Sequence, residues 1–447
     1  MGHHGAKEIP VIDYRNDTEA VRSLFQRDRV HRDVYLDPAL FRIEQERLFP
    51  KAWLFLGHAS QVPGVGDYVT VDLAGQSLIL VRQADRSLRV LANRCAHKGA
   101  AILSYRSGNT GRAFRCPYHG WSYRLDGALL GVPMREGYEG TRMRDCETGA
   151  GLHKVASAEH RGFVFVRLSA TGASFEEYFG TTLAYIDNMA DRSPVGELEV
   201  AGEPIRNIIR CNWKIYLENI NDALHVHAAH EPSANAARTA WAGMPADAPK
   251  PMAIEQLAPF QSSNEFMDSM GGRVLGSGHS IMGTVVSTHS GYSDVPGYAA
   301  LMDDAYGPER ARNILRQSPQ NVVLYPSIAI KGSPQTMRVL RPLAADRTLV
   351  ESWAFRPKGA PDLLTERSMS YNRITFSPMS LLAQDDIHVF EALHRGLVAS
   401  GNEWVSLHRG CRPDEPDTGD LDTTATNELL MRHQYRAWMK FMADGGA

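Results

Sequence analysis

This sequence has few cysteines, a small net charge and no long apolar run. Five cysteines among 447 residues are too few for a disulfide scaffold and suit a reducing compartment, so we expect a cytoplasmic protein. The net charge of −3 gives no basic footprint for nucleic acid or an anionic membrane. No apolar run approaches the length that spans a bilayer, and the first residues lack the apolar stretch of a signal peptide. What remains is an ordinary globular chain, long enough for two or three domains.

The character of the sequence changes along the chain. Residues 15–58 carry apolar residues at helical spacing, whereas residues 66–168 consist of short β segments separated by turn signals. Helical and strand-like segments follow. We expect an α+β protein of three parts: an N-terminal helical segment over 1–47 that packs with the last part, an antiparallel β domain over 48–168, and a catalytic domain over 169–447.

The last part combines helices with antiparallel strands. Residues 213–230 predict a helix, and residues 321–357 contain three strand-like segments. Helices are expected at about 365–400 and 425–443. Residues 231–300 are rich in small residues and proline with weak periodicity, which predicts a mobile, irregular region.

Two cysteines stand close to two histidines in the β-rich part. Cys95 and His97 form a C-x-H pair, Cys116 and His119 form a C-x-x-H pair, and 18 residues separate the pairs. A structural zinc ion would take all four ligands on one metal. A Rieske [2Fe–2S] centre would put the cysteines on one iron and the histidines on the other. One cysteine and one histidine in each loop favour the Rieske centre, because each loop then contacts both irons.

A second group of histidines ends the helix predicted over residues 213–230. Two histidines and one carboxylate on one face of the metal are typical of non-heme Fe(II) oxygenases, which leave positions open for O₂ and substrate. His225 and His230 are five residues apart, about 140° on a regular helix, so they could share a metal only where the helix widens or breaks. His227 and His230 are three residues apart, about 60° around the helix. The spacing does not decide between these pairs.

The third ligand should be a carboxylate from another part of the chain, and residues 381–397 offer one. On a helix over this segment Asp386 shares a face with Leu382 and Phe390, while Asp385 points about 100° away. A lone carboxylate on an apolar, inward face is costly unless a metal compensates its charge. Asp386 is the predicted candidate.

The cysteine–histidine segment resembles the Rieske domain of ring-hydroxylating oxygenases. The stretches NRCAHKGA and RCPYHGWSY, followed by an LDG turn, match that domain over residues 93–127 almost without a gap. The resemblance implies that Cys95 and Cys116 bind one iron of a [2Fe–2S] cluster and that His97 and His119 bind the other.

The histidine-rich segment resembles the catalytic domain of the same family. The family pattern N-W-K-x-x-x-E-N-x-x-D-x-x-H-x-x-x-x-H is present in full. By this match His225 and His230 bind a mononuclear Fe(II), and His227 is a bystander. Asn219 and Asp222 are implied to be catalytic-site residues, with Asp222 hydrogen-bonding His225 and a Rieske histidine of the neighbouring subunit.

A third family segment, Q-[ED]-D-x-x-x-x-E-x-x-Q-R-G-L, selects Asp386 as the remaining iron ligand. Two positions depart from the family, Leu224 where tyrosine is frequent and His394 where glutamine is usual, and neither is a predicted ligand. The resemblance runs from Val30 to Trp404. It implies a Rieske antiparallel β domain and a helix-grip (START-like) catalytic domain with a large antiparallel sheet.

The resemblance also implies an activity and its partners. Such a large (alpha) subunit is a dioxygenase that uses O₂ and electrons from NAD(P)H to cis-dihydroxylate an aromatic ring in aromatic catabolism. A separate flavin or iron–sulfur reductase, with or without a ferredoxin, delivers the electrons, and this chain has no nucleotide-binding fingerprint of its own. The implied assembly is a homotrimer, α3 or, with a small beta subunit, α3β3. The closest alternative is a Rieske monooxygenase, either a ring hydroxylase or an O- or N-demethylase.

The substrate class is indicated only by resemblance. Residues 57–68 and the N-terminal segment look most like those of members that act on benzoate, salicylate or terephthalate-type aromatic acids. An aromatic carboxylate favours a buried arginine as its partner. The sequence offers four candidates, without choosing among them: Arg206, Arg210, Arg338 and Arg341.

Overall fold

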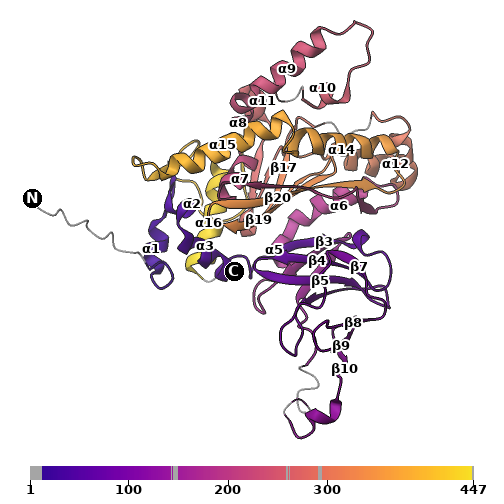
Figure 1. The fold of residues 1–447 in the computed structure, drawn as a ribbon. Helices are drawn as coiled ribbons and strands as arrows, with labels where there is room; N and C mark the ends of the chain where they lie inside the picture. The colour runs from indigo at the N-terminus through magenta and orange to yellow at the C-terminus, as the bar shows by residue number, and fades with distance from the viewer. Residues whose placement is uncertain are drawn as a thin grey trace, which may run out of the picture.

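The protein is described by a computed structural model in which a small β-rich unit lies beneath a larger unit of helices and strands (Figure 1). None of the helices in the described part of the chain is long and apolar enough to cross a membrane. The structure describes residues 13–141, 143, 150–257, 260, 262–289 and 294–444.

The N-terminal segment is only partly helical. Asp37 caps its longest helix by accepting a hydrogen bond from the Ala39 amide, and Pro38 occupies the first turn, where its missing N–H is harmless. Residues 15–58 were expected to be helical. This expectation was wrong for part of the segment, which forms three short strands. The elements are α1 (Thr18–Ser23), β1 (Phe25–Gln26), β2 (Arg29–His31), α2 (Asp33–Leu36), α3 (Pro38–Arg47) and β3 (Leu54–His58).

The β-rich unit has three small antiparallel sheets, which confirms the short strands expected over this region. One sheet has the order β6-β5-β4-β7, a second β10-β9-β8, and a third β11-β12-β3. The strands are β4 (Asp67–Leu73), β5 (Gln76–Arg82), β6 (Leu88–Ala92), β7 (Ser107–Asn109), β8 (Ala113–Arg115), β9 (Ser122–Arg124), β10 (Leu129–Gly131), β11 (Ala156–His160) and β12 (Phe163–Arg167).

The larger unit is built on one nine-stranded antiparallel sheet, as expected. Its order is β13-β20-β19-β18-β17-β16-β15-β22, and β14 also pairs with β20. The strands are β13 (Leu198–Val200), β14 (Ile205–Ile209), β15 (Gly272–Leu275), β16 (His279–Met282), β17 (Asn321–Leu324), β18 (Ile328–Lys331), β19 (Thr336–Ala344), β20 (Arg347–Pro357) and β22 (Leu421–Thr423), while β21 (Trp404–Ser406) pairs with β2.

The two faces of this sheet meet different partners. On one face the Trp353 ring lies 5.4 Å from the Phe55 ring of β3, and Arg341 donates a 2.8 Å hydrogen bond to the Phe55 carbonyl. Helices cover the opposite face, with α14 and α15 prominent in Figure 1. The helices of this unit are α5 (Phe175–Phe179), α6 (Leu183–Asp191), α7 (Trp213–Ile220), α8 (His225–Ala229), α9 (Glu231–Ala242), α10 (Met252–Leu257), α11 (Asn264–Ser269), α12 (Tyr298–Tyr306), α13 (Pro308–Arg316), α14 (Asp362–Phe376), α15 (Leu381–Val398) and α16 (Leu429–Ala443).

Two expectations for this unit were wrong. The helix predicted over 213–230 breaks after Ile220 and restarts at His225. Most of residues 231–289, expected to be irregular, form α9, α10, α11, β15 and β16. The weak periodicity has a physical reason at β16, where all four residues are buried and no polar face alternates with an apolar one.

A buried ion pair joins the N-terminal segment to the catalytic unit. Glu44 of α3 accepts a 2.5 Å hydrogen bond from Lys214 Nζ, and its carboxylate also accepts the indole N–H groups of Trp213 and Trp438 at 2.9 and 2.7 Å. Glu44 and Lys214 are almost completely buried. Since α3, α7 and α16 meet at this carboxylate, it fixes how three distant segments pack.

Glu44→Ala is expected to lower the free energy of unfolding by about 3–5 kcal/mol, because it leaves Lys214 buried without its counter-charge. Glu46→Gln on the same helix is the matched control: its pair with Arg15 is exposed, so the expected loss is about 1 kcal/mol or less. Chemical denaturation of both variants measures the difference. Equal losses of the free energy of unfolding in the two variants would show that the buried pair stabilises the fold no more than the exposed pair does.

A second buried carboxylate lies one residue before Asn219. Glu218 accepts hydrogen bonds from the hydroxyl groups of Tyr35 and Tyr435, and these hydroxyls are 2.8 Å apart. Burial raises the pKa of Glu218 to about 7, although the two tyrosine hydrogen bonds oppose the shift. The folded state thus holds this proton more tightly than the unfolded state does.

The stabilising contribution of protonated Glu218 is expected to be complete below pH 4.5 and to be lost as the pH rises through about 7. Glu218→Gln keeps a neutral acceptor for both tyrosines. Its free energy of unfolding should therefore rise relative to the wild type between pH 5 and 8, by up to about 3 kcal/mol. Denaturation curves across that range measure the difference, and a difference that does not change with pH would refute the assignment.

Candidate metal centres and active site

The two cysteine–histidine pairs occupy loops at one end of the β-rich unit. Cys95 and His97 lie between β6 and β7, and Cys116 and His119 lie between β8 and β9. The two loops repeat one hydrogen-bond pattern. The amide of each cysteine donates to the carbonyl five residues later, at 2.8 Å in both loops, and the amide four residues later donates back to the cysteine carbonyl. The two pairs are thus held by equivalent turns.

A glycine completes each turn. Gly99 and Gly120 donate the returning hydrogen bonds and have φ values of +78° and +70°, in the left-handed region that favours glycine. The Cβ of any other residue at Gly99 would lie 3.2 Å from the Arg94 side chain. The C-x-H-x-G and C-x-x-H-G spacings therefore follow from the backbone that the turn requires.

The donor atoms in these loops fit a metal cluster. Cys95 and Cys116 are buried and not in disulfides, and the Nδ1 atoms of His97 and His119 are buried without a hydrogen-bond partner. The two imidazole rings lie 4.7 Å apart, and the His97 ring stacks on Trp121. Unpaired buried ring nitrogens are costly, so an iron ion bound at these atoms would explain them.

The spread of the donors argues against one zinc ion. Four ligands of a tetrahedral zinc lie at about 2.0–2.3 Å from the metal, so they lie within about 4 Å of one another. Within the described ranges, only His225, His230 and Asp386 place three such atoms within 4.8 Å. The wider spacing of the cysteine–histidine donors is what a two-iron cluster requires.

The break between α7 and α8 positions the histidines of the second centre. The Asp222 side chain accepts a 2.8 Å hydrogen bond from the Leu224 amide, which stabilises a turn in place of continued helix. The chain re-enters a helix at His225, and His230 stands at the junction of α8 and α9, followed by Pro232 in the first turn of α9. The short helix brings both imidazoles to one side, with their ring centres 5.5 Å apart.

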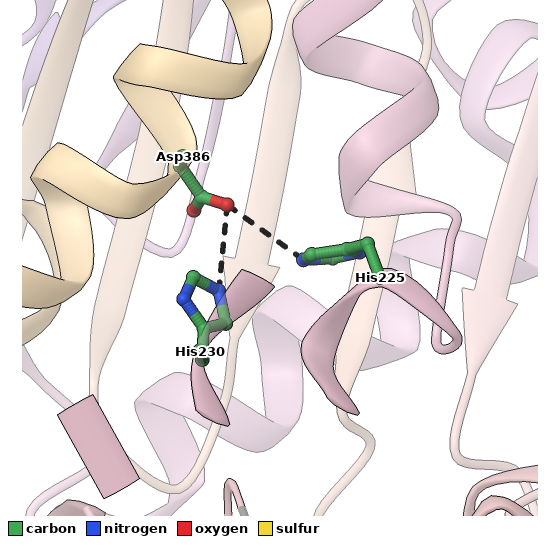
Figure 2. Close-up of side chains that lie close together, drawn as sticks. All are labelled: His225, His230 and Asp386. Atoms are coloured by element: carbon green, nitrogen blue, oxygen red, sulfur yellow. Dashed lines mark ion pairs between the residues drawn. The ribbon is translucent and has the colours of Figure 1, made fainter. Parts of the chain in front are cut away.

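Asp386 of α15 completes the second centre. One oxygen of its carboxylate lies 3.4 Å from His230 Nε2 and 3.8 Å from His225 Nε2. Figure 2 shows the three side chains turned toward one another from α15 and from the two ends of α8. This is the arrangement of two histidines and one carboxylate that can hold Fe(II). His227 is exposed, so the structure favours the five-residue histidine spacing that sequence geometry left open.

Burial and neighbouring charges shift the pKa values of the three candidate ligands. Burial lowers the pKa of His225, which favours the neutral imidazole that binds metals. Burial also acts to raise the pKa of Asp386, but the hydrogen bond from His230 and the nearby imidazoles and Arg338 outweigh it, so the pKa lies below its usual value. For His230 the two neighbouring aspartates outweigh burial and raise the pKa. A metal ion would take the place of that proton.

Two further side chains orient the ligands. Asn219 donates a 3.3 Å hydrogen bond to the same oxygen of Asp386 that faces both histidines. Asp385 lies 3.4 Å from His230 Nδ1 and accepts a 2.8 Å hydrogen bond from Ser233. Asp385 was expected to point about 100° away from Asp386 on the helix, yet both carboxylates contact His230. The contact of Asp385 with His230 was missed, because it depends on how α15 packs against α8.

Asp222 stands at the edge of the centre. Its second oxygen lies 4.0 Å from His225 Nδ1, a buried nitrogen without a hydrogen-bond partner, and its first oxygen lies 3.6 Å from an Arg409 nitrogen. The sequence expectation of a direct hydrogen bond to His225 is not met at this distance. Asp222 is nevertheless the carboxylate that faces the outer nitrogen of this imidazole.

The four arginine candidates have different surroundings. Arg341 and Arg206 both pair with Glu351, at 3.2 and 2.9 Å, and Arg210 is exposed. Only Arg338 lines the cavity that contains the three converging ligands.

Comparison with known proteins agrees with this arrangement. Residues 52–142 match the Rieske [2Fe-2S] domain, and residues 187–444 match the catalytic domain of the ring hydroxylating alpha subunit. The chain is 28% identical to the biphenyl dioxygenase alpha subunit of Paraburkholderia xenovorans over 95% of this chain and 94% of that protein. It is also 28% identical to the anthranilate 1,2-dioxygenase large subunit of Acinetobacter baylyi, over 93% and 90% of the two chains.

A solved structure of naphthalene 1,2-dioxygenase with indole in its active site has the same fold. It superposes with a TM-score of 0.75 at 25% identity and covers 97% of this chain and 96% of its own. The part with the cysteine–histidine loops and the part with His225, His230 and Asp386 therefore both match the same family. The chain belongs to the alpha subunits of the ring-hydroxylating dioxygenase family, oxidoreductases that combine a Rieske [2Fe–2S] cluster with a mononuclear iron.

Proposed function

We propose that this alpha subunit cis-dihydroxylates the ring of an aromatic carboxylic acid, using O₂ and electrons that originate from NAD(P)H and arrive through a separate reductase. The convergence of His225, His230 and Asp386 within 4.8 Å on the wall of a cavity carries the proposal. The alternative is a monooxygenase on a related aromatic substrate, which would use the same metal ligands.

In this proposal His225, His230 and Asp386 would hold an Fe(II) ion at the wall of the cavity. Bound there, the iron supplies the activation of O₂. Asn219 holds the Asp386 carboxylate in place, and Asp385 holds the outer nitrogen of His230. Partners of this kind orient metal ligands and typically change metal affinity or activity 10- to 100-fold when removed.

The cavity wall suits an aromatic ring. Its apolar part includes three methionines and two phenylalanines, which would bind the ring and exclude water from the reacting carbon. These residues are Phe260, Met267, Met270, Met282 and Phe376.

The electron path we propose runs between subunits. Cys95 and Cys116 bind one iron of the cluster, and His97 and His119 bind the other. Within one chain the loops of the β-rich unit and α8 lie on opposite sides of the nine-stranded sheet (Figure 1). A head-to-tail homotrimer, α3 or α3β3, would place the cluster of one subunit beside the Asp222 of the next. A reductase, with or without a ferredoxin, would reduce the cluster.

The first test counts oxygen atoms. Iron-replete protein is incubated with a generic reductase, isotopically labelled O₂ and a panel of aromatic acids beside their neutral amides. Two labelled atoms in the product of an acid are expected. One labelled atom, or loss of a methyl group, would establish the monooxygenase alternative, and turnover of the amides alone would refute the carboxylate assignment.

Asp222→Asn tests the path between subunits. Reoxidation of the chemically reduced cluster by O₂ in the presence of substrate is expected to slow by at least about 10-fold, while the iron content stays unchanged. His227→Gln, on the same short helix but exposed, is the control and should reoxidise at the wild-type rate. Rapid-mixing absorbance at the cluster bands measures both rates. An unchanged rate in Asp222→Asn would remove this carboxylate from the path.

A further inference from the structure

Two buried cations line the active-site cavity. Lys331 ends β18 and Arg338 lies in β19, and the two residues are only 5% and 6% exposed. The strand register explains why they meet. Arg338 pairs with Ala329, two residues before Lys331, so both side chains project from the same face of the sheet, into the cavity that Asp386 also lines.

Neither cation has a carboxylate partner. Lys331 Nζ donates to the Gln320 carbonyl at 2.9 Å and lies 3.2 Å from His289 Nε2. Arg338 donates to the Asn321 side-chain oxygen at 2.9 Å, and its guanidinium lies 4.7 Å from the centre of the Phe376 ring. No carboxylate in the described part of the chain lies within ion-pair distance of either cation.

Three other buried cations in the described part of the chain contact a carboxylate, whereas Arg192 donates to the carbonyls of Ile314, Leu315 and Gln317. Lys214 contacts Glu44 at 2.5 Å, Arg432 contacts Glu415 at 2.6 Å, and Arg341 contacts Glu351 at 3.2 Å. A buried charge without a counter-charge is strongly destabilising, so an exception next to a cavity calls for an external anion.

The charges inside the cavity also favour a bound anion. Burial, together with the charge of Arg338, lowers the pKa of Lys331 well below its usual value. The acids that line the cavity are Asp222 and Asp386, and the charge of Asp386 is committed to the iron site. A carboxylate bound between the two cations would supply the missing negative charge and restore the protonated lysine.

We propose that Lys331 and Arg338 bind the carboxylate of the aromatic substrate and are the specificity-determining residues of this enzyme. The inference deepens the proposed function and rests on it. A carboxylate held between the two cations would place the ring in the same cavity as Met282, Phe376 and the iron ligands. The site thereby selects acids over neutral aromatics and sets which ring carbons face the iron.

Binding without turnover tests the inference. Iron-loaded protein is titrated anaerobically, by calorimetry, with benzoate, anthranilate and toluate and with the corresponding amides. The wild type is expected to bind at least one acid about 10-fold or more tightly than its amide, as loss of charge-assisted hydrogen bonds predicts. Lys331→Met and Arg338→Met should each weaken binding of the acid by about 10- to 100-fold and leave the affinity for the amide unchanged.

Arg206→Met is the matched control, because it removes a cation from the same sheet that already pairs with Glu351. It should bind the acid with wild-type affinity. An unchanged far-UV circular dichroism spectrum and an unchanged iron content show that each variant is folded. If a methionine variant fails to fold, Lys331→Gln and Arg338→Gln are measured in its place.

The inference is overturned if no acid binds more tightly than its amide, or if both cavity variants keep wild-type affinity for the acid. The outcome is separable from that of the proposed function. An acid that binds through Lys331 and Arg338 but gains no oxygen would refute the function alone. Oxygenation of an acid that binds and turns over equally well in the wild type, Lys331→Met and Arg338→Met would refute the inference alone.

Discussion

One carboxylate oxygen of Asp386 is the point on which the rest of this structure depends. It faces the Nε2 atoms of His225 and His230 and accepts the amide of Asn219. These contacts require α7 to stop early, α8 to be short and α15 to lie across both. A chain that continued α7 as a regular helix would direct the two histidines about 140° apart and could not form the site.

The large sheet separates two tasks between its faces. Trp353 and Arg341 project toward the β-rich unit, whereas Lys331 and Arg338 project into the cavity on the other side. Because side chains alternate along a strand, one sheet supports the electron-carrying unit and shapes the substrate site at once. The buried Glu44, at the meeting of α3, α7 and α16, holds the first helix of the ligand-bearing segment against this frame.

Sequence alone predicted what is local and missed what depends on packing. The spacing of Cys95 and His97 reveals a metal loop, because a short turn fixes both ligands. The antiparallel strands and the helix that carries Asp386 were also correctly predicted, since their periodicity is strong. The choice of His225 over His227 came from a family resemblance, because helix geometry cannot foresee a break stabilised by the Asp222 turn. The choice of Arg338 among four arginines needed the strand register, which no single segment contains.

Counting iron tests the central claim most directly. The wild-type protein should hold two irons in its cluster and one more at the site of His225, His230 and Asp386. Asp386→Ala should lose that one iron while the absorbance of the cluster remains unchanged. Retention of the full iron content in Asp386→Ala, or loss of the cluster together with the third iron, would contradict the account of two independent metal centres.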